Sequence, residues 1–478
     1  MPINSFLYPA PSTPTFAYDV ANSCRFDDGS SDYLNITPSS AGNRKTWTWS
    51  GWVKRGTFGA NSIFEAGTAS NNSLGFQFES GTDNLQFFVY NGSSLTVNVK
   101  TTQVFRDVSA WYHIVVAFDT TQGTASNRVK LYVNGSQVTD LAATTYPSQN
   151  TDYNINNTNT HQLGRAVFGG SNYFDGYMAE VVLIDGTALD PTSFGEFDED
   201  SPNIWKPKDV SGLTFGTNGF HLDFENASNL GADVSGNSNN FTVNNLTSVD
   251  QSTDTCTNNF ATLNPLATNT NTSSSDFKQG NLVLGPNSSG TWIGCTNTIG
   301  VTTGKWYAEY KILESGTSQN GIMVGVTNSD LSDFQNRASD LSQTGAFGLN
   351  YYAAGTINNN GSGIATYTAM SDDDIVQIAL DVDNGKVYWG RNGTYENSGD
   401  PTSGSTGTGA QNLSLITTGG TYNLHLCCRN NGHAQANYGS PPYSISSGNS
   451  DANGHGNFEY AVPSGYFALC SKNLAEFG

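Results

Sequence analysis

The chain has 478 residues, 41 of them acidic and 20 basic, and a formal net charge of −21 at pH 7. This length allows about three ordinary domains or two large β domains. The acidic excess excludes the basic footprint that nucleic-acid binding requires and disfavours contact with anionic membranes. No run of about 18 apolar residues is present, so no membrane insertion is predicted.

Residues 1–22 are predicted to form an extended N-terminal arm. Its prolines, at positions 2, 9, 11 and 14, favour extended backbone without internal hydrogen bonds. The arm lacks a basic n-region, an apolar stretch and a small-residue cleavage site, so no signal peptide is predicted. The remaining chain is rich in Gly, Asn, Ser and Thr, as exposed β modules are. A virus particle released by lysis would carry such modules outside without a signal peptide.

Residues 23–198 show short apolar runs separated by turn signals, the pattern of an all-β domain. The run at 129–133 alternates and meets Asn134-Gly135, which favours a type I′ hairpin. A short helix or turn is expected only at 191–197. Strands are expected at 47–53, 75–79, 85–90, 112–118, 129–133 and 177–184.

Several motifs of this block follow one another in a recognisable order: WSGWV at 49–53, WYHIVVAFD at 111–119, KLYVNG at 130–135 and FDGYMAEV at 174–181. In this order the block resembles the laminin-G/pentraxin-like family of concanavalin A-type jelly rolls. The resemblance implies an antiparallel β-sandwich. Such relatives often hold calcium with loop Asp residues, so it also implies Asp119 and Asp175 as calcium ligands. The alternative is that both are ordinary turn-forming Asp residues.

Residues 199–289 are predicted to be a connector with a few strands. Two runs, at 219–224 and 240–243, are strand candidates, and the Thr/Asn/Ser tract at 268–275 is the best linker candidate. The stretch 212–266, and above all NNFATLNP at 258–265, resembles connectors between such modules in marine phage structural proteins.

Residues 290–478 form a second β block with strands expected at 304–310, 321–326, 374–381 and 386–389. The segment 378–393, IALDVDNGKVYWGRNG, places the turn 383–385 between two strands. From 305 to 439 the order is similar to the SPRY family, a bent sandwich of two antiparallel sheets. The expected fold is therefore all-β: two antiparallel β-sandwich (jelly-roll) domains joined by a connector, with the extended arm in front.

Aromatic residues beside amides are the candidate ligand-binding residues. Tyr351 and Tyr352 end a strand-like run before a polar loop that holds Asn358 and Asn359. Flat rings next to amide groups suit sugar ligands. The alternative is that these tyrosines belong to the core beneath ordinary loops.

No catalytic residues are predicted. The acids at 196, 198 and 200 alternate, which loosely matches the E-x-D-x-E strand of some glycanases, but they lie in a polar segment after Pro191. Retaining hydrolysis needs two carboxyl groups about 5–5.5 Å apart across a groove, and an exposed acidic turn is the preferred interpretation. The six cysteines form no C-x-x-C pair and are expected to be buried thiols outside disulfides.

Together these features predict a non-enzymatic phage virion surface protein, either head decoration or a head fibre, or a tail fibre. Its expected partners are other virion proteins of the capsid or tail, host-surface glycans and further copies of itself. The expected location is the virion surface. The alternative is a secreted lectin or glycan-active enzyme, which would need an export route. No cofactor other than calcium is expected.

Overall fold

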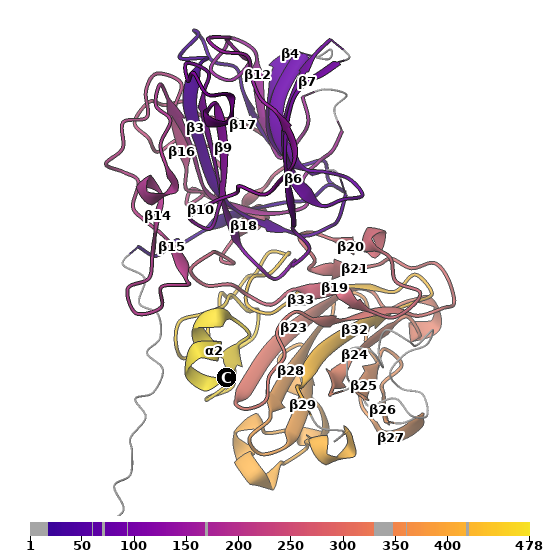
Figure 1. Cartoon of the computed structure of the whole chain (residues 1–478). Helices are drawn as coiled ribbons and strands as arrows, with labels where there is room; N and C mark the ends of the chain where they lie inside the picture. The colour runs from indigo at the N-terminus through magenta and orange to yellow at the C-terminus, as the bar shows by residue number, and fades with distance from the viewer. Residues whose placement is uncertain are drawn as a thin grey trace, which may run out of the picture.

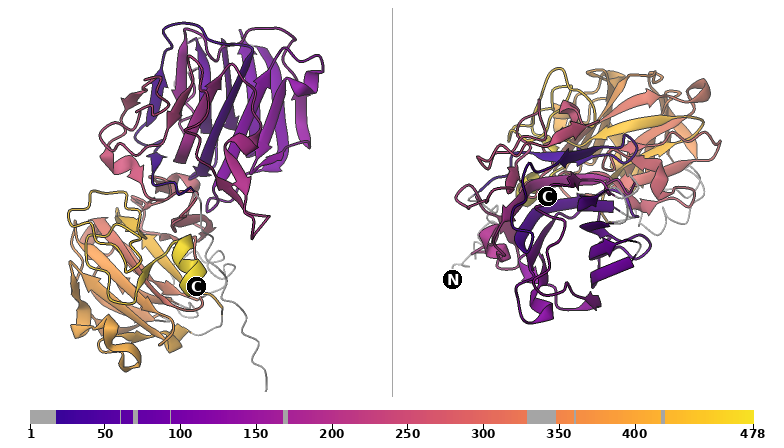
Figure 2. Two further views of the ribbon diagram at one scale, coloured as in Figure 1. Left: turned by 90° about the vertical axis from the view of Figure 1, so that its left-hand side faces the viewer. Right: turned by 90° about the horizontal axis from the view of Figure 1, so that it is seen from above.

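The computed structural model is all-β and describes residues 18–59, 61–68, 72–92, 94–167, 171–328, 348–359, 361–416 and 420–478. Two sandwiches lie one above the other, with the N-terminal half of the chain in one and the C-terminal half in the other (Figure 1). Figure 2 shows the same arrangement from the side and from above. Most of the predicted arm, residues 1–17, lies outside the described residues.

One sheet of the first sandwich has the strand order β10-β9-β8-β3-β13-β1-β18, and β16 also pairs with β13. All of these pairings are antiparallel. The strands are β1 (Ser23–Phe26), β3 (Thr46–Arg55), β8 (Tyr112–Asp119), β9 (Val129–Val133), β10 (Ser136–Gln137), β13 (Gly176–Asp185), β16 (Phe220–Leu222) and β18 (Gln251–Ser252).

The facing sheet has the order β11-β7-β6-β5-β4-β12-β2-β17. Its strands are β2 (Tyr33–Ile36), β4 (Asn61–Thr68), β5 (Asn72–Phe78), β6 (Asn84–Asn91), β7 (Ser94–Val104), β11 (Leu141–Thr145), β12 (Thr160–Leu163) and β17 (Thr242–Asn244). A separate ribbon pairs β14 (Gly195–Phe197) with β15 (Trp205–Pro207).

The second sandwich also has two sheets, with the orders β19-β22-β32-β24-β25-β26-β27 and β20-β21-β33-β23-β28-β29-β30. In the first are β19 (Leu263–Thr268), β22 (Ile293–Asn297), β24 (Ile322–Thr327), β25 (Gly348–Tyr352), β26 (Thr356–Asn359), β27 (Ser362–Thr366) and β32 (Asn423–Cys428). In the other are β20 (Phe277–Lys278), β21 (Val283–Leu284), β23 (Lys305–Glu314), β28 (Ile375–Asp381), β29 (Lys386–Arg391), β30 (Thr394–Tyr395) and β33 (His433–Asn437), with β31 (Gln411–Asn412) and β34 (Phe467–Ala468) beside them.

Helices among the described residues are short. The α-helix α2 spans Ser471–Phe477, close to the junction of the two sandwiches (Figure 1). The 3₁₀ helices are η1 (Ala125–Asn127), η2 (Pro191–Ser193), η3 (Ser248–Asp250), η4 (Ser274–Asp276), η5 (Thr317–Gln319), η6 (Glu396–Ser398), η7 (Pro401–Thr406) and η8 (Leu413–Ile416). Within the described residues no helix is long and apolar enough to cross a membrane.

Aromatic rings fill both cores because strand residues alternate between the interior and the outer face. In the first sandwich the ring of Trp47 stacks on Phe118 at 4.7 Å between centroids, and Trp49 meets Phe76 edge-on at 4.7 Å. In the second, Tyr310 and Tyr438 are fully buried and their hydroxyls are 3.0 Å apart. Each buried ring contributes roughly 1.5–3 kcal/mol to stability.

The segment expected as a connector, residues 199–289, is divided between the two sandwiches. Its strands β16, β17 and β18 pair with β13, β2 and β1 of the first sandwich. Its strands β19 and β21 pair with β22 and β33 of the second. The short strands of this stretch therefore complete the sheets on either side.

The junction between the sandwiches is polar and buried. The hydroxyl of Tyr177 donates to the carbonyl of Gly280 at 2.9 Å, and Asn281 Nδ2 donates to the carbonyl of Gly56 at 2.9 Å. Nearby, the link that follows β18 is held by a buried ion pair of 2.7 Å between Lys54 Nζ and Asp254 Oδ2. Hydrogen bonds of this kind depend on direction, so they specify how one sandwich is oriented on the other.

The six cysteines all lie within the described residues, and none of them forms a disulfide. Cys24, Cys295, Cys427, Cys428 and Cys470 are buried, and Cys256 is half-buried. Burial raises the pKa of the Cys24, Cys256 and Cys470 thiols above its usual value.

Candidate functional site

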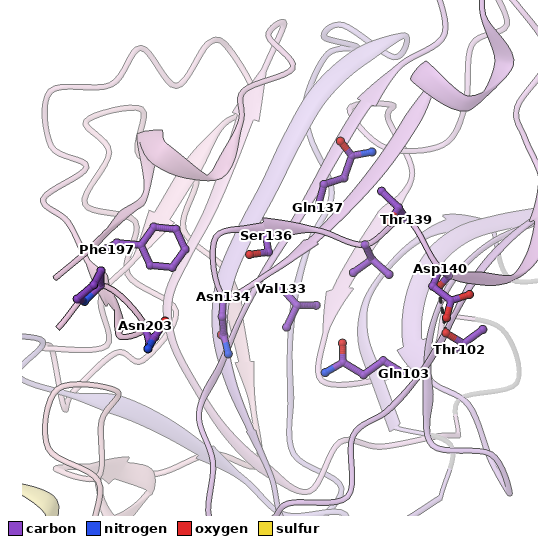
Figure 3. Close-up of a pocket in the computed structure, with 12 residues that line it drawn as sticks. Thr102, Gln103, Val133, Asn134, Ser136, Gln137, Thr139, Asp140, Phe197 and Asn203 are labelled. Atoms are coloured by element: carbon purple, nitrogen blue, oxygen red, sulfur yellow. Dashed lines mark hydrogen bonds between the residues drawn. The ribbon is translucent and has the colours of Figure 1, made fainter.

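An open cleft of about 780 Å³ lies on the first sandwich, between the β9–β10 hairpin, the end of β7 and the segment after β14. Figure 3 shows Phe197 on one side of it and Thr102, Gln103 and Asp140 on the other. The residues that line it are Thr102, Gln103, Val133, Asn134, Ser136, Gln137, Val138, Thr139, Asp140, Phe197, Pro202 and Asn203. Cavities of this size hold small-molecule ligands in other proteins.

Packing around Trp205 positions the two sides of the cleft. Trp205 lies opposite Phe197 in the β14–β15 ribbon, and their rings meet edge-on at 4.9 Å between centroids. The hairpin turn also packs against Trp205: a Cβ atom on Gly135 would lie 2.3 Å from its ring. Gly135 also has a φ of 78°, which glycine adopts easily. The predicted Asn134-Gly135 turn therefore also supports the β14–β15 ribbon by packing against Trp205.

The lining is mostly neutral and polar around one exposed ring. Phe197 is 45% exposed although its neighbour Trp205 is buried. Gln103, Gln137 and Asn203 bring amide groups, each of which offers both donors and an acceptor. A sugar has hydroxyl groups that pair with amides and C–H faces that pack on an aromatic ring. The cleft therefore has the chemistry to bind a carbohydrate.

Beneath this region Ser50 and His113 form a pair that superficially resembles a catalytic one. Ser50 Oγ lies 2.8 Å from His113 Nε2, and Trp205 Nε1 donates to His113 Nδ1 at 2.9 Å. Because Nδ1 accepts a hydrogen bond, the ring proton sits on Nε2 and is donated to the serine. Burial lowers the pKa of His113 to about 3. A histidine that activates a serine must accept the serine proton at Nε2, whereas here Nε2 donates. The adjoining cavity also has no room for a water molecule.

Two of the three alternating acids, Glu196 in β14 and Asp198 just after it, pair with a lysine. Lys206 lies opposite Glu196 in the ribbon, and its Nζ is 3.7 Å from Glu196 Oε1 and 3.3 Å from Asp198 Oδ2. Asp198 Oδ1 accepts from the backbone N–H groups of Asp200 and Ser201 at 3.0 and 2.9 Å. Asp198 is thus a turn-forming acid, and the ribbon carries an ion-pair network at this point.

The four candidate ligand-binding residues of the second sandwich lie on β25 and β26. Tyr351 is fully buried in the core, and its hydroxyl donates to the carbonyl of Thr368. It has no ring face to offer a ligand, so the predicted role of Tyr351 needs correction. Tyr352 is half-buried with its ring edge-on to Trp292 at 5.8 Å. Asn358 and Asn359 are half-buried, and Asn359 Nδ2 donates to the carbonyl of Leu415 at 3.1 Å.

The two candidate calcium ligands have different surroundings. Asp119 accepts from Thr121 Oγ1 at 2.6 Å and Gln122 Nε2 at 2.6 Å, as a turn-forming Asp does. Burial raises its pKa, but these hydrogen bonds outweigh that effect and lower it. Among the described residues, Asp119 belongs to no group of three metal-ligating side chains.

Asp175 does belong to such a group, together with Asp27 and Asp28. One ligand atom from each of the three residues lies within 4.8 Å of the others. Asp175 is fully buried, and the backbone N–H of Gly280 lies near its carboxylate. Burial first, and then the charges of Asp27 and Asp28, raise its pKa well above the usual value. These three carboxylates are the candidate metal ligands of the described chain.

Comparison with known proteins agrees with the fold of the first sandwich. Residues 28–192 match the Laminin_G_3 family model, described as the concanavalin A-like lectin/glucanases superfamily. This confirms the laminin-G-like prediction for that part of the chain. No curated protein sequence matches the chain.

Several solved structures are similar in part. The SPRY domain of human HERC1 is 17% identical with a TM-score of 0.24, covering 31% of this chain and 83% of that one. A SAP-like pentraxin from Limulus polyphemus is 17% identical with a TM-score of 0.28, covering 36% and 80%. Domain 4 of AbnA, an extracellular arabinanase from Geobacillus stearothermophilus, is 18% identical with a TM-score of 0.25, covering 31% and 65%.

Proposed function

We propose that the protein is a non-enzymatic glycan-binding protein and that the polar cleft of the first sandwich holds the sugar. The observation that carries this proposal is the exposed ring of Phe197 beside the amides of Gln103, Gln137 and Asn203. The family description of residues 28–192, which names lectins and glucanases, supports the same class of ligand.

A glycan array probed with the full chain, followed by calorimetric titration of the best ligand, tests this proposal. Phe197→Ala removes the ring face, and we expect roughly tenfold weaker binding, which corresponds to about 1.4 kcal/mol. Gln137→Ala removes one amide and should weaken binding less. Tyr90→Ala is the matched control, because Tyr90 is also an exposed aromatic of the first sandwich, at 38%, outside the cleft. Equal binding by the Phe197 and Tyr90 variants would place the sugar elsewhere.

A glycan-active enzyme is the competing class of protein. The network of Glu196, Asp198 and Lys206 favours a structural role for these acids. A reducing-sugar release assay on polysaccharides, with the wild type and Glu196→Ala, separates the two classes. Release of sugar that the substitution abolishes would overturn the non-enzymatic proposal.

We further propose that the protein is displayed on the surface of a phage particle, with other virion proteins and further copies of itself as partners. The resemblance of residues 212–266 to connectors in marine phage structural proteins supports this. In the structure these residues span the first sandwich and its link to the second. Immunogold labelling of purified particles, with antibody against residues 290–470, tests the proposal. Gold over the head indicates capsid decoration, gold at the tail indicates host attachment, and particles without gold contradict virion display.

A further inference from the structure

A lysine, an aspartate and an asparagine meet where the first sandwich contacts the link to the second. Lys54 stands in β3, and Asp254 and Asn259 belong to the segment between β18 and β19. Lys54 Nζ donates to Asp254 Oδ2 at 2.7 Å and to Asn259 Oδ1 at 2.7 Å. The lysine nitrogen therefore contacts a carboxylate and a primary amide at the same time.

Water is largely excluded from the lysine and the aspartate. Their side chains are each 1% exposed. The ring centroid of Tyr177 lies 5.5 Å from Lys54 Nζ, and Trp111 Nε1 donates to Asp254 Oδ1 at 3.1 Å. A buried ammonium and a buried carboxylate are costly to desolvate, and transfer of one proton between them leaves a neutral amine and a neutral carboxylic acid. A neutral amine is a nucleophile.

The amide of Asn259 is oriented with its oxygen toward the lysine. Its nitrogen, Nδ2, donates instead to the carbonyl of Ser109 at 2.7 Å. Because a carbonyl bond is about 1.2 Å long, Lys54 Nζ lies within about 4 Å of the amide carbon Cγ. Reacting groups in near-attack conformers are about 3–3.5 Å apart, so a small rotation of the lysine side chain brings the nitrogen to that carbon.

The backbone of Asn259 is fixed by the start of helix α2. The N–H of Asn259 donates to Ser471 Oγ at 3.0 Å, and the N–H of Ser471 donates to the carbonyl of Asn259 at 2.8 Å. The next residue, Phe260, forms an antiparallel bridge with Cys470. The amide is therefore held against the lysine by ordered backbone on both sides, which lowers the entropic cost of a reaction between them.

We propose that Lys54 and Asn259 form an intramolecular isopeptide bond and that Asp254 catalyses the reaction. Asp254 takes one proton from the ammonium, and the amine attacks Cγ of Asn259. Asp254 donates this proton to Nδ2 and accepts a second one from Nζ, so that the Cγ–Nδ2 bond breaks and ammonia leaves. Ammonia takes the second proton and departs as ammonium, which returns Asp254 to its carboxylate. The reaction needs no oxidant and no other reactant.

This bond ties the two sandwiches together covalently. Lys54 lies in the first sandwich, whereas Asn259 is bonded to α2 and leads into β19 of the second. The two residues are 205 positions apart in the chain. A cross-link that closes so long a loop restricts the unfolded chain and stabilises the folded one. The bond is independent of any sugar ligand and of any virion partner.

The first test is the intact mass of the purified full chain, measured under denaturing conditions. We expect the wild type to be lighter than its sequence mass by one ammonia molecule. Tryptic digestion should yield a branched peptide that joins residues 46–55 to residues 209–278, because trypsin does not cleave after an acylated lysine. Loss of ammonia at an Asn-Gly turn would leave no such peptide. A wild type at full sequence mass without the branched peptide overturns the proposal.

Three variants assign the roles. Asn259→Ala, at a half-buried position, should have its full sequence mass and melt roughly 10 °C below the wild type. Asp254→Asn keeps both reacting groups but removes the proton carrier, so it should remain unreacted. Lys206→Met is the matched control, since Lys206 is also a buried lysine paired with acids, and it should keep the branched peptide.

The mass measurement separates the bond from a purely structural ion pair, because only the bond removes ammonia. A branched peptide in Asp254→Asn would contradict the catalytic role of Asp254. An ammonia deficit that persists in Asn259→Ala would contradict the assignment of the bond. Asn259→Ala keeps the test decisive if the buried Asp254 variant does not fold.

Discussion

Phe197 in the first sandwich and Tyr351 in the second are both aromatic residues at strand ends beside polar loops, yet one ring is exposed and the other is buried. Phe197 is 45% exposed at the cleft, and Tyr351 is fully buried in the core. The difference comes from sheet position. Strand β25 lies between β24 and β26, so its alternate side chains face the interior, whereas β14 belongs to a ribbon outside the main sheets. Polar sequence neighbours therefore do not reveal whether a ring is available to a ligand.

The strongest test of this contrast is Tyr351→Ala. We expect it to lower the free energy of unfolding by roughly 3–5 kcal/mol, because a large ring is removed from a packed core. Urea unfolding measures the loss, and glycan binding by the remaining folded protein should be unchanged. Reduced glycan affinity with unchanged stability would instead restore Tyr351 as a ligand residue.

Two buried histidines, one in each sandwich, should change the stability of the protein with pH in opposite directions. His425 of the second sandwich is fully buried, and burial lowers its pKa to about 3 from 6.5. The unfolded chain thus takes up a proton more readily, so this histidine makes stability fall as pH drops below about 6.5. Between pH 7 and pH 4 we expect a loss on the order of 2–4 kcal/mol from this group. Denaturant unfolding of the wild type and His425→Asn should show a shallower acid dependence in the variant.

His221 of the first sandwich should show the opposite sign. Burial lowers its pKa, but the hydrogen bond and charge of Glu180, 2.9 Å away, outweigh burial and raise it. A raised folded pKa gives stability that is complete below about 6.5 and is lost as pH rises through the folded value. The contribution should be about 1 kcal/mol. Comparing His221→Asn with the wild type at pH 6 and pH 9 measures it; a larger difference at pH 9 would contradict the assignment.

The smallest expected change in stability is that of Phe197→Ala, within about 0.5 kcal/mol, because the ring is largely outside the core. The same substitution should nevertheless weaken glycan binding, whereas Tyr351→Ala should lower stability and leave binding unchanged. Thermal unfolding alongside the titration checks both parts. A stability loss as large as that of Tyr351→Ala would show that Phe197 is mainly a structural residue of the ribbon.

Much of the fold could be predicted because local patterns determine it. The alternating run before Asn134-Gly135 is strand β9, and the turn leads into β10 as the hairpin signal indicates. The strands between 199 and 289 are harder to predict. They are short, as in the three residues of β16, and they pair with strands distant in the sequence, which no local pattern specifies.

The candidate sites show the same limit. Asp175 is predictable as a candidate because it stands at a strand end. Its neighbours Asp27 and Asp28, however, come from the opposite end of the first block, and only the pairing of β1 with β13 brings them together. In the sequence Phe197 is simply the residue between two acids, Glu196 and Asp198. The signal that could have identified it is an aromatic residue in an otherwise polar, charged segment, where no core face exists to bury it.

The cysteines, five of them buried and Cys256 half-buried, have a practical consequence for labelling experiments. Thiol reagents attack the thiolate form, which burial suppresses in Cys24, Cys256, Cys295, Cys428 and Cys470. A new cysteine at an exposed rim position of the cleft, such as Ser136→Cys, would react well ahead of the native thiols. A single environment-sensitive dye could therefore be attached beside Phe197 in the otherwise unaltered chain, and its emission would report whether a sugar enters the cleft, as proposed.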